Sequence, residues 1–236
     1  MSDAPALMRL EAAITECRAC PRLVAWRERV AREKRAAFAE EEYWGRPVPG
    51  FGDPDARLLV LGLAPAAHGG NRTGRIFTGD RSGEWIFGAL FRAGYANQPH
   101  SLHRDDGLVL RDCFISAPVR CAPPANKPAP GERDRCQPWL EKEVTLLPHL
   151  NVVLALGSFA WESAVRVFSP GRRPRPRFAH GAEADLGAVA LVGSYHVSQQ
   201  NTFTGKLTEA MLDAVVARAQ VLTAGVPRSE WGLGRS

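Results

Sequence analysis

One stretch of the chain, residues 57–80, constrains the fold more than any other. An apolar run of strand length at residues 58–63 leads into a glycine-rich, basic loop, and a helical pattern resumes at Ser82. Loops at the carboxyl ends of parallel strands are where open α/β sheets bind their ligands, because a rigid scaffold presents an exposed backbone there. The stretch therefore predicts a strand, a ligand-binding loop and a helix.

Apolar strand-like runs alternate with helical patterns along the rest of the chain. Further strands are predicted at residues 108–119, 151–157 and 186–195, and helices at residues 6–15, 22–42, 82–94, 132–147, 158–168 and 207–222. This alternation predicts a single α/β domain over residues 1–236, a three-layer α/β/α sandwich around a four-stranded, mainly parallel sheet. In this interpretation residues 1–45 form N-terminal helices and residues 223–236 form a C-terminal tail.

Charge and cysteine usage narrow the class of protein. The 30 Lys and Arg residues outnumber the 25 Asp and Glu residues and give a net charge of +5, which is compatible with a polyanionic partner. No apolar run approaches the roughly 20 residues of a membrane span, and the N-terminus does not resemble a secretory signal, so we expect a cytoplasmic protein without membrane contact. The odd count of five cysteines argues against a closed disulfide framework.

The glycine-rich loop does not match the motifs that bind free nucleotides. The phosphate-binding template ends in Gly-Lys followed by Ser or Thr, whereas Gly74 is followed here by Arg75 and Ile76. No Gly-x-Gly-x-x-Gly occurs at the strand end either. The backbone amides of this loop, together with Arg72 and Arg75, could instead hold the phosphates of a polymer.

Four cysteines form a set that could bind metal. Cys17 and Cys20 make a Cys-x-x-Cys pair near the N-terminus, and Cys121 and Cys136 follow far along the chain. Thiolates bind iron-sulfur clusters or zinc, and the spacing does not separate these two. Free buried thiols or a redox-active pair are the alternatives. Cys113 lies inside an apolar strand and is predicted to be a core residue.

Several motifs together carry a resemblance to a known family. They are the Cys17-x-x-Cys20 pair, Cys136, Gly-Leu-Ala-Pro at residues 62–65, Arg-Thr-Gly-Arg-Ile-Phe at 72–77, Arg-Cys-Ala-Pro-Pro-Ala-Asn at 120–126 and His-Val-Ser at 196–198. In this combination the chain resembles the iron-sulfur uracil-DNA glycosylases, and within that superfamily family 5. The resemblance extends over residues 6–222 and implies the α/β/α fold. It also implies that Cys17, Cys20, Cys121 and Cys136 hold a structural 4Fe-4S cluster.

The resemblance assigns roles around a flipped base. Phe77 would stack on the base, Asn126 would read its edge, and Gly62 and Ala64 would line its binding site. Taken without the resemblance, Phe77 could equally be a core residue, and Asn126 would be a turn residue.

The segment after the last strand is expected to combine catalysis with DNA binding. His196 would stabilise the negative charge that develops on the pyrimidine oxygen, although a lone histidine at a strand end is otherwise often a surface residue. Val197 stands where the family usually has proline. The DNA contacts expected from the loop that follows are Ser198, Gln199, Gln200, Asn201 and Lys206.

The residue that activates water is not obvious from the sequence. Residues 64–67 read Ala-Pro-Ala-Ala and offer no carboxylate. Asp80 is the nearest acid in the loop, and His68 and Asn71 are the other polar candidates. Asp80 could equally serve as the N-cap of the helix that begins near Ser82.

The sequence as a whole therefore predicts a DNA-repair glycosylase. We expect a monomer that flips uracil, and other deaminated or damaged bases, out of double-stranded DNA. It would hydrolyse the N-glycosidic bond without strand cleavage and leave an abasic site. The alternatives are a non-catalytic iron-sulfur or zinc nucleic-acid-binding module and an electron-transfer iron-sulfur protein, the latter disfavoured because the cysteines suffice for only one cluster.

Overall fold

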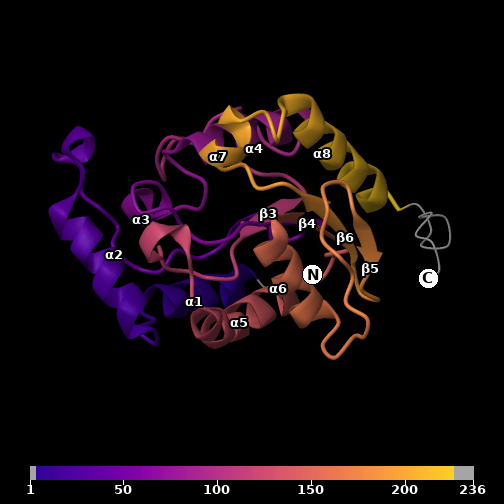
Figure 1. The fold of residues 1–236 in the computed structure, drawn as a ribbon, viewed down its shortest axis with the longest axis horizontal. Helices are drawn as coiled ribbons and strands as arrows, with labels where there is room; N and C mark the ends of the chain where they lie inside the picture. Colours follow the sequence, from indigo (N-terminus) through magenta and orange to yellow (C-terminus); the bar gives the residue numbers. More distant parts are fainter. Residues whose placement is uncertain (1–3, 226–236) are drawn as a thin grey trace.

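The computed structural model describes residues 4–225, whose centre is a six-stranded sheet in the order β1-β3-β2-β4-β6-β5 (Figure 1). The four inner strands are parallel: β2 (Leu58–Leu61), β3 (Cys113–Ser116), β4 (Val152–Leu156) and β6 (Ala190–Ser194). The edge strands β1 (Phe51–Gly52) and β5 (Glu183–Asp185) pair antiparallel. The parallel strands are confirmed, but the predicted total of four is too low, because the edge strands are too short to leave a pattern in the sequence.

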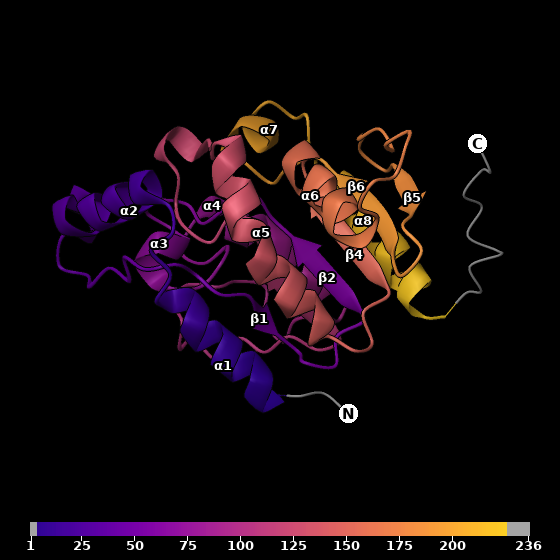
Figure 2. The same cartoon turned by 90° about the horizontal axis from the view of Figure 1, so that it is seen from below.

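Helices cover both faces of this sheet and make the predicted three-layer sandwich (Figure 2). On one face α4 (Arg81–Arg92) and α8 (Glu209–Thr223) pack against Leu58 and Val60 of β2. On the other face α1 (Ala4–Thr15), α5 (Pro130–Thr145) and α6 (Ser158–Phe168) cover Leu59 and Leu61. Successive residues of a strand point to opposite faces, so a strand buried on both sides is apolar throughout.

Several element boundaries differ from the sequence-based predictions. The helix expected at residues 22–42 is α2 (Pro21–Glu33), which ends at Lys34 with φ of 54°, followed by a 3-10 turn at Ala36–Phe38. The strand expected at residues 108–119 shrinks to β3. The helix expected at residues 132–147 is α5, and Pro138 lies in its middle and not in its first turn. Two short helices, α3 (Gly70–Thr73) and α7 (Gln199–Phe203), lie within segments predicted as loops.

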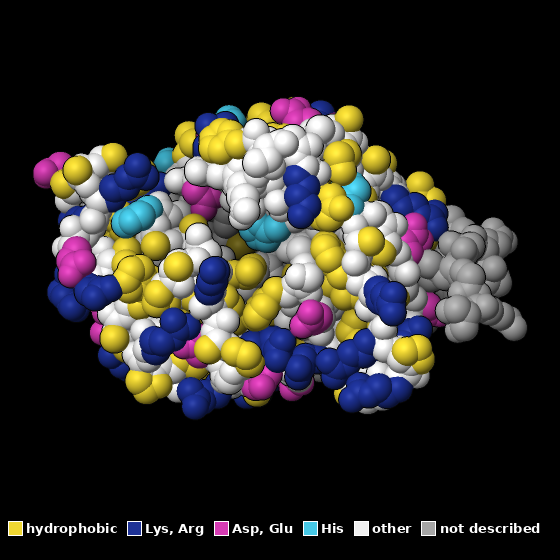
Figure 3. Space-filling view, in the orientation of Figure 1, with side chains coloured by type: hydrophobic (Ala, Val, Ile, Leu, Met, Phe, Trp, Pro, Cys, Tyr) yellow, Lys and Arg dark blue, Asp and Glu magenta, His cyan; other side chains and the backbone are white. Residues whose placement is uncertain are grey.

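The parallel strands direct three functional loops to one side of the molecule. The segments after β2, β3 and β6 all leave the carboxyl edge of the sheet, which faces the viewer in Figures 1 and 3. Figure 3 shows that this face is hollowed near its centre, where a histidine side chain is visible. None of the helices within residues 4–225 is long and apolar enough to cross a membrane. The last part of the predicted tail, residues 226–236, lies outside the described residues.

Candidate functional site

Phe77 and His196 meet at the carboxyl edge of the sheet although they come from different loops. Their ring centroids are 6.3 Å apart with an interplanar angle of 46°. Phe77 is buried and has a φ of 56°, a conformation that costs energy for a residue with a large side chain. Its ring lies so close to Gly62 that a Cβ added there would be 2.7 Å from Phe77 Cζ. The structure thus brings together Gly62, Phe77 and His196.

His196 is held from two sides and is largely withdrawn from water. The side-chain amide of Asn201 donates a hydrogen bond to the His196 carbonyl oxygen at 2.8 Å. On the other side lies Gly157 at the end of β4, where an added Cβ would be 3.3 Å from His196 Cβ. Burial lowers the pKa of His196 to about 4, so its imidazole is neutral at pH 7.

A pocket of about 550 Å³ opens on the same side of the protein and gathers polar side chains from several loops. Asp80, Asn126, Gln199 and His68 line it. Asn126 follows Ala125 in a left-handed turn, with φ of 55° and 53°, and its side chain is exposed. The pocket thus collects residues from the loops after β2, β3 and β6.

Asp80 caps a helix and also lines the pocket. Its Oδ1 accepts a hydrogen bond from the Gly83 amide at 3.0 Å, which makes it the N-cap of α4. The second oxygen, Oδ2, lies over Gly69, where an added Cβ would come within 2.1 Å of it. Burial raises the pKa of the Asp80 carboxyl, so the group is less hydrated than a surface aspartate.

The other two polar candidates for water activation differ in their surroundings. His68 lines the pocket, and its Nδ1 lies 2.9 Å from the hydroxyl of Tyr43. Burial, with smaller effects from Arg35 and Arg72, lowers the pKa of His68. Asn71 is fully buried and donates to the carbonyl oxygen of Arg27 at 3.2 Å, so its side chain faces α2 and not the pocket.

The guanidinium of Arg72 is already bound within the protein. It lines the pocket but is 8% exposed. Its guanidinium donates to the carbonyl oxygens of His68 and Gly79, pairs with Glu41 and stacks on Phe38 at 4.0 Å. The structure therefore does not support the prediction that Arg72 contacts DNA, because its donors already bind protein acceptors that fix the shape of the loop.

Arg75 is withdrawn from the surface in the same way. Its guanidinium donates to Thr78 at 3.0 Å, to Ser101 at 2.6 Å and to both oxygens of Asp106 at 2.7 Å. Both members of the Arg75–Asp106 pair are buried. The predicted DNA contact of Arg75 is not supported either, since this ion pair ties the glycine-rich loop to residues 101–106.

The α7 segment contains one residue that supports the backbone of His196 and several residues that are exposed. Asn201, predicted to contact DNA, is instead hydrogen-bonded to the backbone of His196. Gln199, Gln200 and Lys206 are exposed, whereas Ser198, partly buried, precedes α7 as its N-cap. The sequence analysis did not single out Phe203 as a surface residue of this segment, although it is 65% exposed beside Arg81. The signal for it was a lone aromatic residue in a polar loop.

Ala64 also differs from its predicted place. Its side chain packs against the small cluster of Leu23, Val119 and Cys121, on the side of the cysteines. Any contact of Ala64 with a base would therefore have to come from its backbone.

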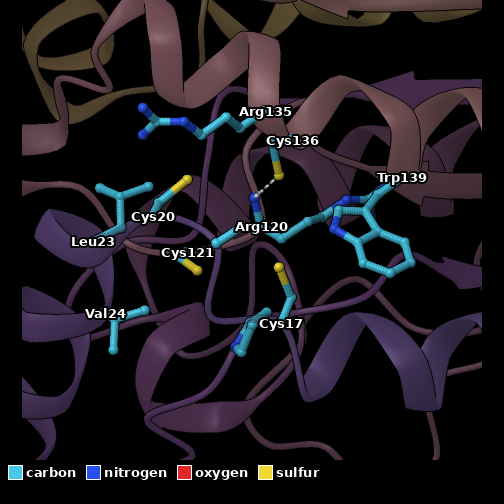
Figure 4. Close-up of a pocket in the computed structure, with 11 residues that line it drawn as sticks. Cys17, Cys20, Leu23, Val24, Arg120, Cys121, Arg135, Cys136 and Trp139 are labelled. Atoms are coloured by element: carbon cyan, nitrogen blue, oxygen red, sulfur yellow. Dashed lines mark hydrogen bonds between the residues drawn. The ribbon is translucent and has the colours of Figure 1, made fainter.

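The four cysteines of the predicted ligand set line a single pocket (Figure 4). Cys17 and Cys20 come from the turn between α1 and α2, Cys121 follows β3, and Cys136 lies on α5. Apolar side chains, including Leu23, Val24 and Trp139, make up much of the remaining wall. Within residues 4–225, no three His, Cys, Asp or Glu side chains are placed to hold one metal ion.

Buried guanidinium groups surround this cysteine pocket. Arg27 donates to Cys121 Sγ at 2.9 Å, and the backbone amide of Arg120 donates to Cys136 Sγ at 3.3 Å. Burial raises the pKa of the free thiols to about 11 for Cys121 and about 12 for Cys136. Arg27 Nε and two nitrogens of Arg120 are buried without a partner among the described residues. The charge of Arg120 is already compensated by the buried Glu143 at 2.7 Å. The pocket nevertheless fits an anionic group that is held by thiolates, because such a group would supply acceptors for the remaining buried N–H donors.

Comparisons with known proteins show the family of this chain. The family model described as "Uracil DNA glycosylase superfamily" matches residues 49–220. A Mycobacterium bovis protein named type-5 uracil-DNA glycosylase is 56% identical over 221 residues, covering 93% of this chain and 82% of the relative. Proteins of the same name from Mycobacterium leprae and Thermus thermophilus are 54% and 52% identical, covering 93% and 89% of this chain and 96% and 94% of the relatives.

Proposed function

This chain belongs to the uracil DNA glycosylase superfamily, and we propose from that premise how its residues excise uracil from DNA. It is a uracil-DNA glycosylase, a hydrolase of DNA repair, as the sequence motifs predicted. The uracil flips out of the duplex into the space beside Gly62, Phe77 and His196, and water replaces it on the sugar to leave an abasic site. The observation that carries this proposal is the meeting of Phe77 with a neutral His196 at the carboxyl edge of the sheet.

His196 stabilises the leaving group in this proposal. When the N-glycosidic bond breaks, negative charge develops on the pyrimidine and positive charge on the sugar. A neutral imidazole can donate one N–H to the pyrimidine oxygen, and it places no cation beside the developing sugar cation. Because His196 is largely withdrawn from water and Asn201 fixes its backbone, the hydrogen bond needs little reorganisation and is stronger than in water.

Asp80 orients the attacking water in this proposal. If the sugar cation forms early, the nucleophile requires orientation more than deprotonation, and a capping carboxylate with one oxygen left over is suited to that role. Asn126 and Gln199 line the same pocket, and we expect them to contact the target nucleotide. No lysine lines this pocket within the described residues, so no Schiff base and no strand cleavage are expected.

An excision assay tests the proposed activity directly. Duplex DNA with one uracil is incubated with the protein and then heated in alkali, which breaks the strand at abasic sites. Cleavage at the uracil position is expected, and His196→Ala should slow it while abasic DNA still binds. Intact DNA at high protein concentration, with binding retained, would instead support a non-catalytic DNA-binding module. Duplexes with hypoxanthine and xanthine test the wider base range.

We further propose that Cys17, Cys20, Cys121 and Cys136 hold a 4Fe-4S cluster with a structural role. The cluster, when bound, crosslinks segments of the chain through four thiolates and supplies no step of the hydrolysis. The cysteines would then fasten the α1–α2 turn to α5 and to the loop that carries Asn126. Broad absorbance near 400 nm with matching iron and sulfide contents is expected, whereas zinc in their place would overturn the assignment.

DNA is the partner that follows from the activity, and we propose double-stranded DNA bound by a monomer in the cytoplasm. The exposed Gln199, Gln200 and Lys206 are its expected contacts near the target base. Size-exclusion chromatography with light scattering, with and without duplex, tests the monomer.

A further inference from the structure

The segment between α6 and β5 carries positive charge that the protein leaves uncompensated. This basic loop, residues 171–178, contains Arg172, Arg173, Arg175 and Arg177, all exposed. No carboxylate within residues 4–225 forms an ion pair with any of the four. By contrast, Arg166 on the preceding helix lies 3.7 Å from Asp134. Four like charges crowded on one loop repel each other, so the arrangement favours a polyanionic partner.

The basic loop is anchored to the strand end that leads to His196. The Trp161 indole donates to the Pro176 carbonyl oxygen at 2.9 Å. Phe178 packs edge-on against Trp161 at 6.0 Å and against Tyr195 at 6.4 Å. His180 lies against the ring of Tyr195 at 5.0 Å, and its Nδ1 accepts a hydrogen bond from the Tyr195 amide. Since Tyr195 directly precedes His196, these contacts hold the loop in a fixed position relative to the reaction centre.

The loop also lies on the side of the protein that opens toward DNA. Figure 3 shows Lys and Arg side chains gathered along the lower part of the face with the central hollow, including its lower right, where the α6–β5 segment lies in Figure 1. The arginines therefore flank the active site on the side away from α7. A duplex held over the hollow would meet α7 and the basic loop at separate places along its backbone.

We propose that the basic loop binds phosphates of the DNA duplex at a distance from the flipped nucleotide, as a second backbone contact of the enzyme. This inference rests on the proposed function. Arginine suits the task because its planar guanidinium donates two parallel hydrogen bonds to a phosphate. Contacts of this kind position the duplex and carry no base specificity.

The test compares two double variants of equal charge. Arg175→Gln with Arg177→Gln removes two of the loop's four positive charges, at positions where no hydrogen bond within the described protein is lost. Arg9→Gln with Arg111→Gln is the matched control: both residues are exposed, Arg111 precedes β3 at the opposite edge of the sheet, and Figure 2 shows α1, which carries Arg9, at the end away from α7. Binding is measured with duplexes that contain a tetrahydrofuran abasic analogue, at several salt concentrations and duplex lengths.

The loop variant should lose up to two phosphate contacts and the control none. The slope of log affinity against log salt would then fall by about 0.9 per contact, so the defect should be about tenfold larger at 50 mM than at 200 mM salt. The difference between wild type and loop variant should vanish on duplexes too short to reach the loop.

Equal affinities and slopes for the two double variants would overturn the proposal and leave the loop as a solvated turn. A defect that is independent of duplex length would also overturn it. Failure of the wild-type protein to excise uracil would instead refute the proposed function, so the two failures are distinguishable.

Discussion

Acidification from pH 7 to pH 5 should destabilise the wild-type enzyme by about 2 kcal/mol more than a variant with His196→Gln. The reason is the environment of His196, where burial lowers the pKa from 6.5 to about 4. In the unfolded chain the imidazole regains water and binds a proton below pH 6.5. The folded protein binds that proton only near pH 4, so protons favour unfolding throughout this window.

The magnitude follows from proton linkage. Lowering the pKa of His196 from 6.5 to about 4 corresponds to about 3.4 kcal/mol when stability below pH 4 is compared with stability above pH 7. Roughly 2 kcal/mol of this is lost by pH 5, and above pH 7 His196 contributes no pH dependence. His68 and His180, whose pKa values burial also lowers, are common to both proteins, so their contributions cancel in the difference between the proteins.

Urea unfolding at pH 7 and pH 5 measures this difference through the unfolding midpoint and slope of each protein. Parallel loss of stability in wild type and His196→Gln would refute the burial argument. Single-turnover excision provides a second check, because a histidine with pKa near 4 cannot produce an acid limb near pH 6.5. An acid limb near pH 6.5 that His196→Gln abolishes would show that the imidazole is hydrated and titrates normally.

Substitutions at three further positions distinguish residues that support the structure from residues that take part in catalysis. Asp80→Asn keeps the helix cap, so it should leave thermal stability unchanged while single-turnover excision falls at least tenfold. Asp80→Ala should in addition lower the free energy of unfolding by about 1 kcal/mol. A full excision rate in Asp80→Asn would remove the carboxylate from the mechanism. Gly62→Ala places a methyl group 2.7 Å from Phe77 Cζ and should reduce excision by about a hundredfold with abasic-DNA binding retained, and an unchanged rate would mean that the ring position does not matter. Arg75→Met leaves Asp106 buried without its ion-pair partner and should lower the free energy of unfolding in urea by about 3 to 5 kcal/mol. The dependence of DNA affinity on salt should stay unchanged. A stable variant with a weaker salt dependence would restore the predicted phosphate contact.

The sequence predicted the layers of the fold because the inner strands are apolar on both faces. β4, for example, is buried at every position and stands out as an uninterrupted apolar run. The same reasoning could not find β1 or β5, which have two and three residues and depend on pairing with distant strands. The early end of α2 was missed for a related reason, since Lys34 ends this helix through its backbone conformation and is neither glycine nor proline.

The sequence could indicate which residues share one edge of the sheet, but not which of them are bound by distant partners. His196 and Phe77 lie near each other because each belongs to a segment that leaves a parallel strand, and their roles stay predictions. Arg75 was misplaced because an arginine in a glycine-rich loop suggests phosphate, and its actual partner, Asp106, lies in a separate segment of the chain. Sequence displays a charge, but only the fold shows whether that charge is already neutralised.

Burial has opposite effects on the pKa values of the two proposed catalytic groups. It raises the pKa of Asp80 and lowers that of His196, so both groups are pushed toward their neutral forms. For His196 the neutral form is the working form, but for Asp80 the working form is the carboxylate. Lowering the pH should therefore inactivate the enzyme by protonating Asp80, and this loss should begin above the pH range in which an ordinary aspartate titrates. An acid limb of the excision rate that persists in His196→Gln and disappears in Asp80→Asn would follow from these roles. The reverse pattern would exchange the two roles.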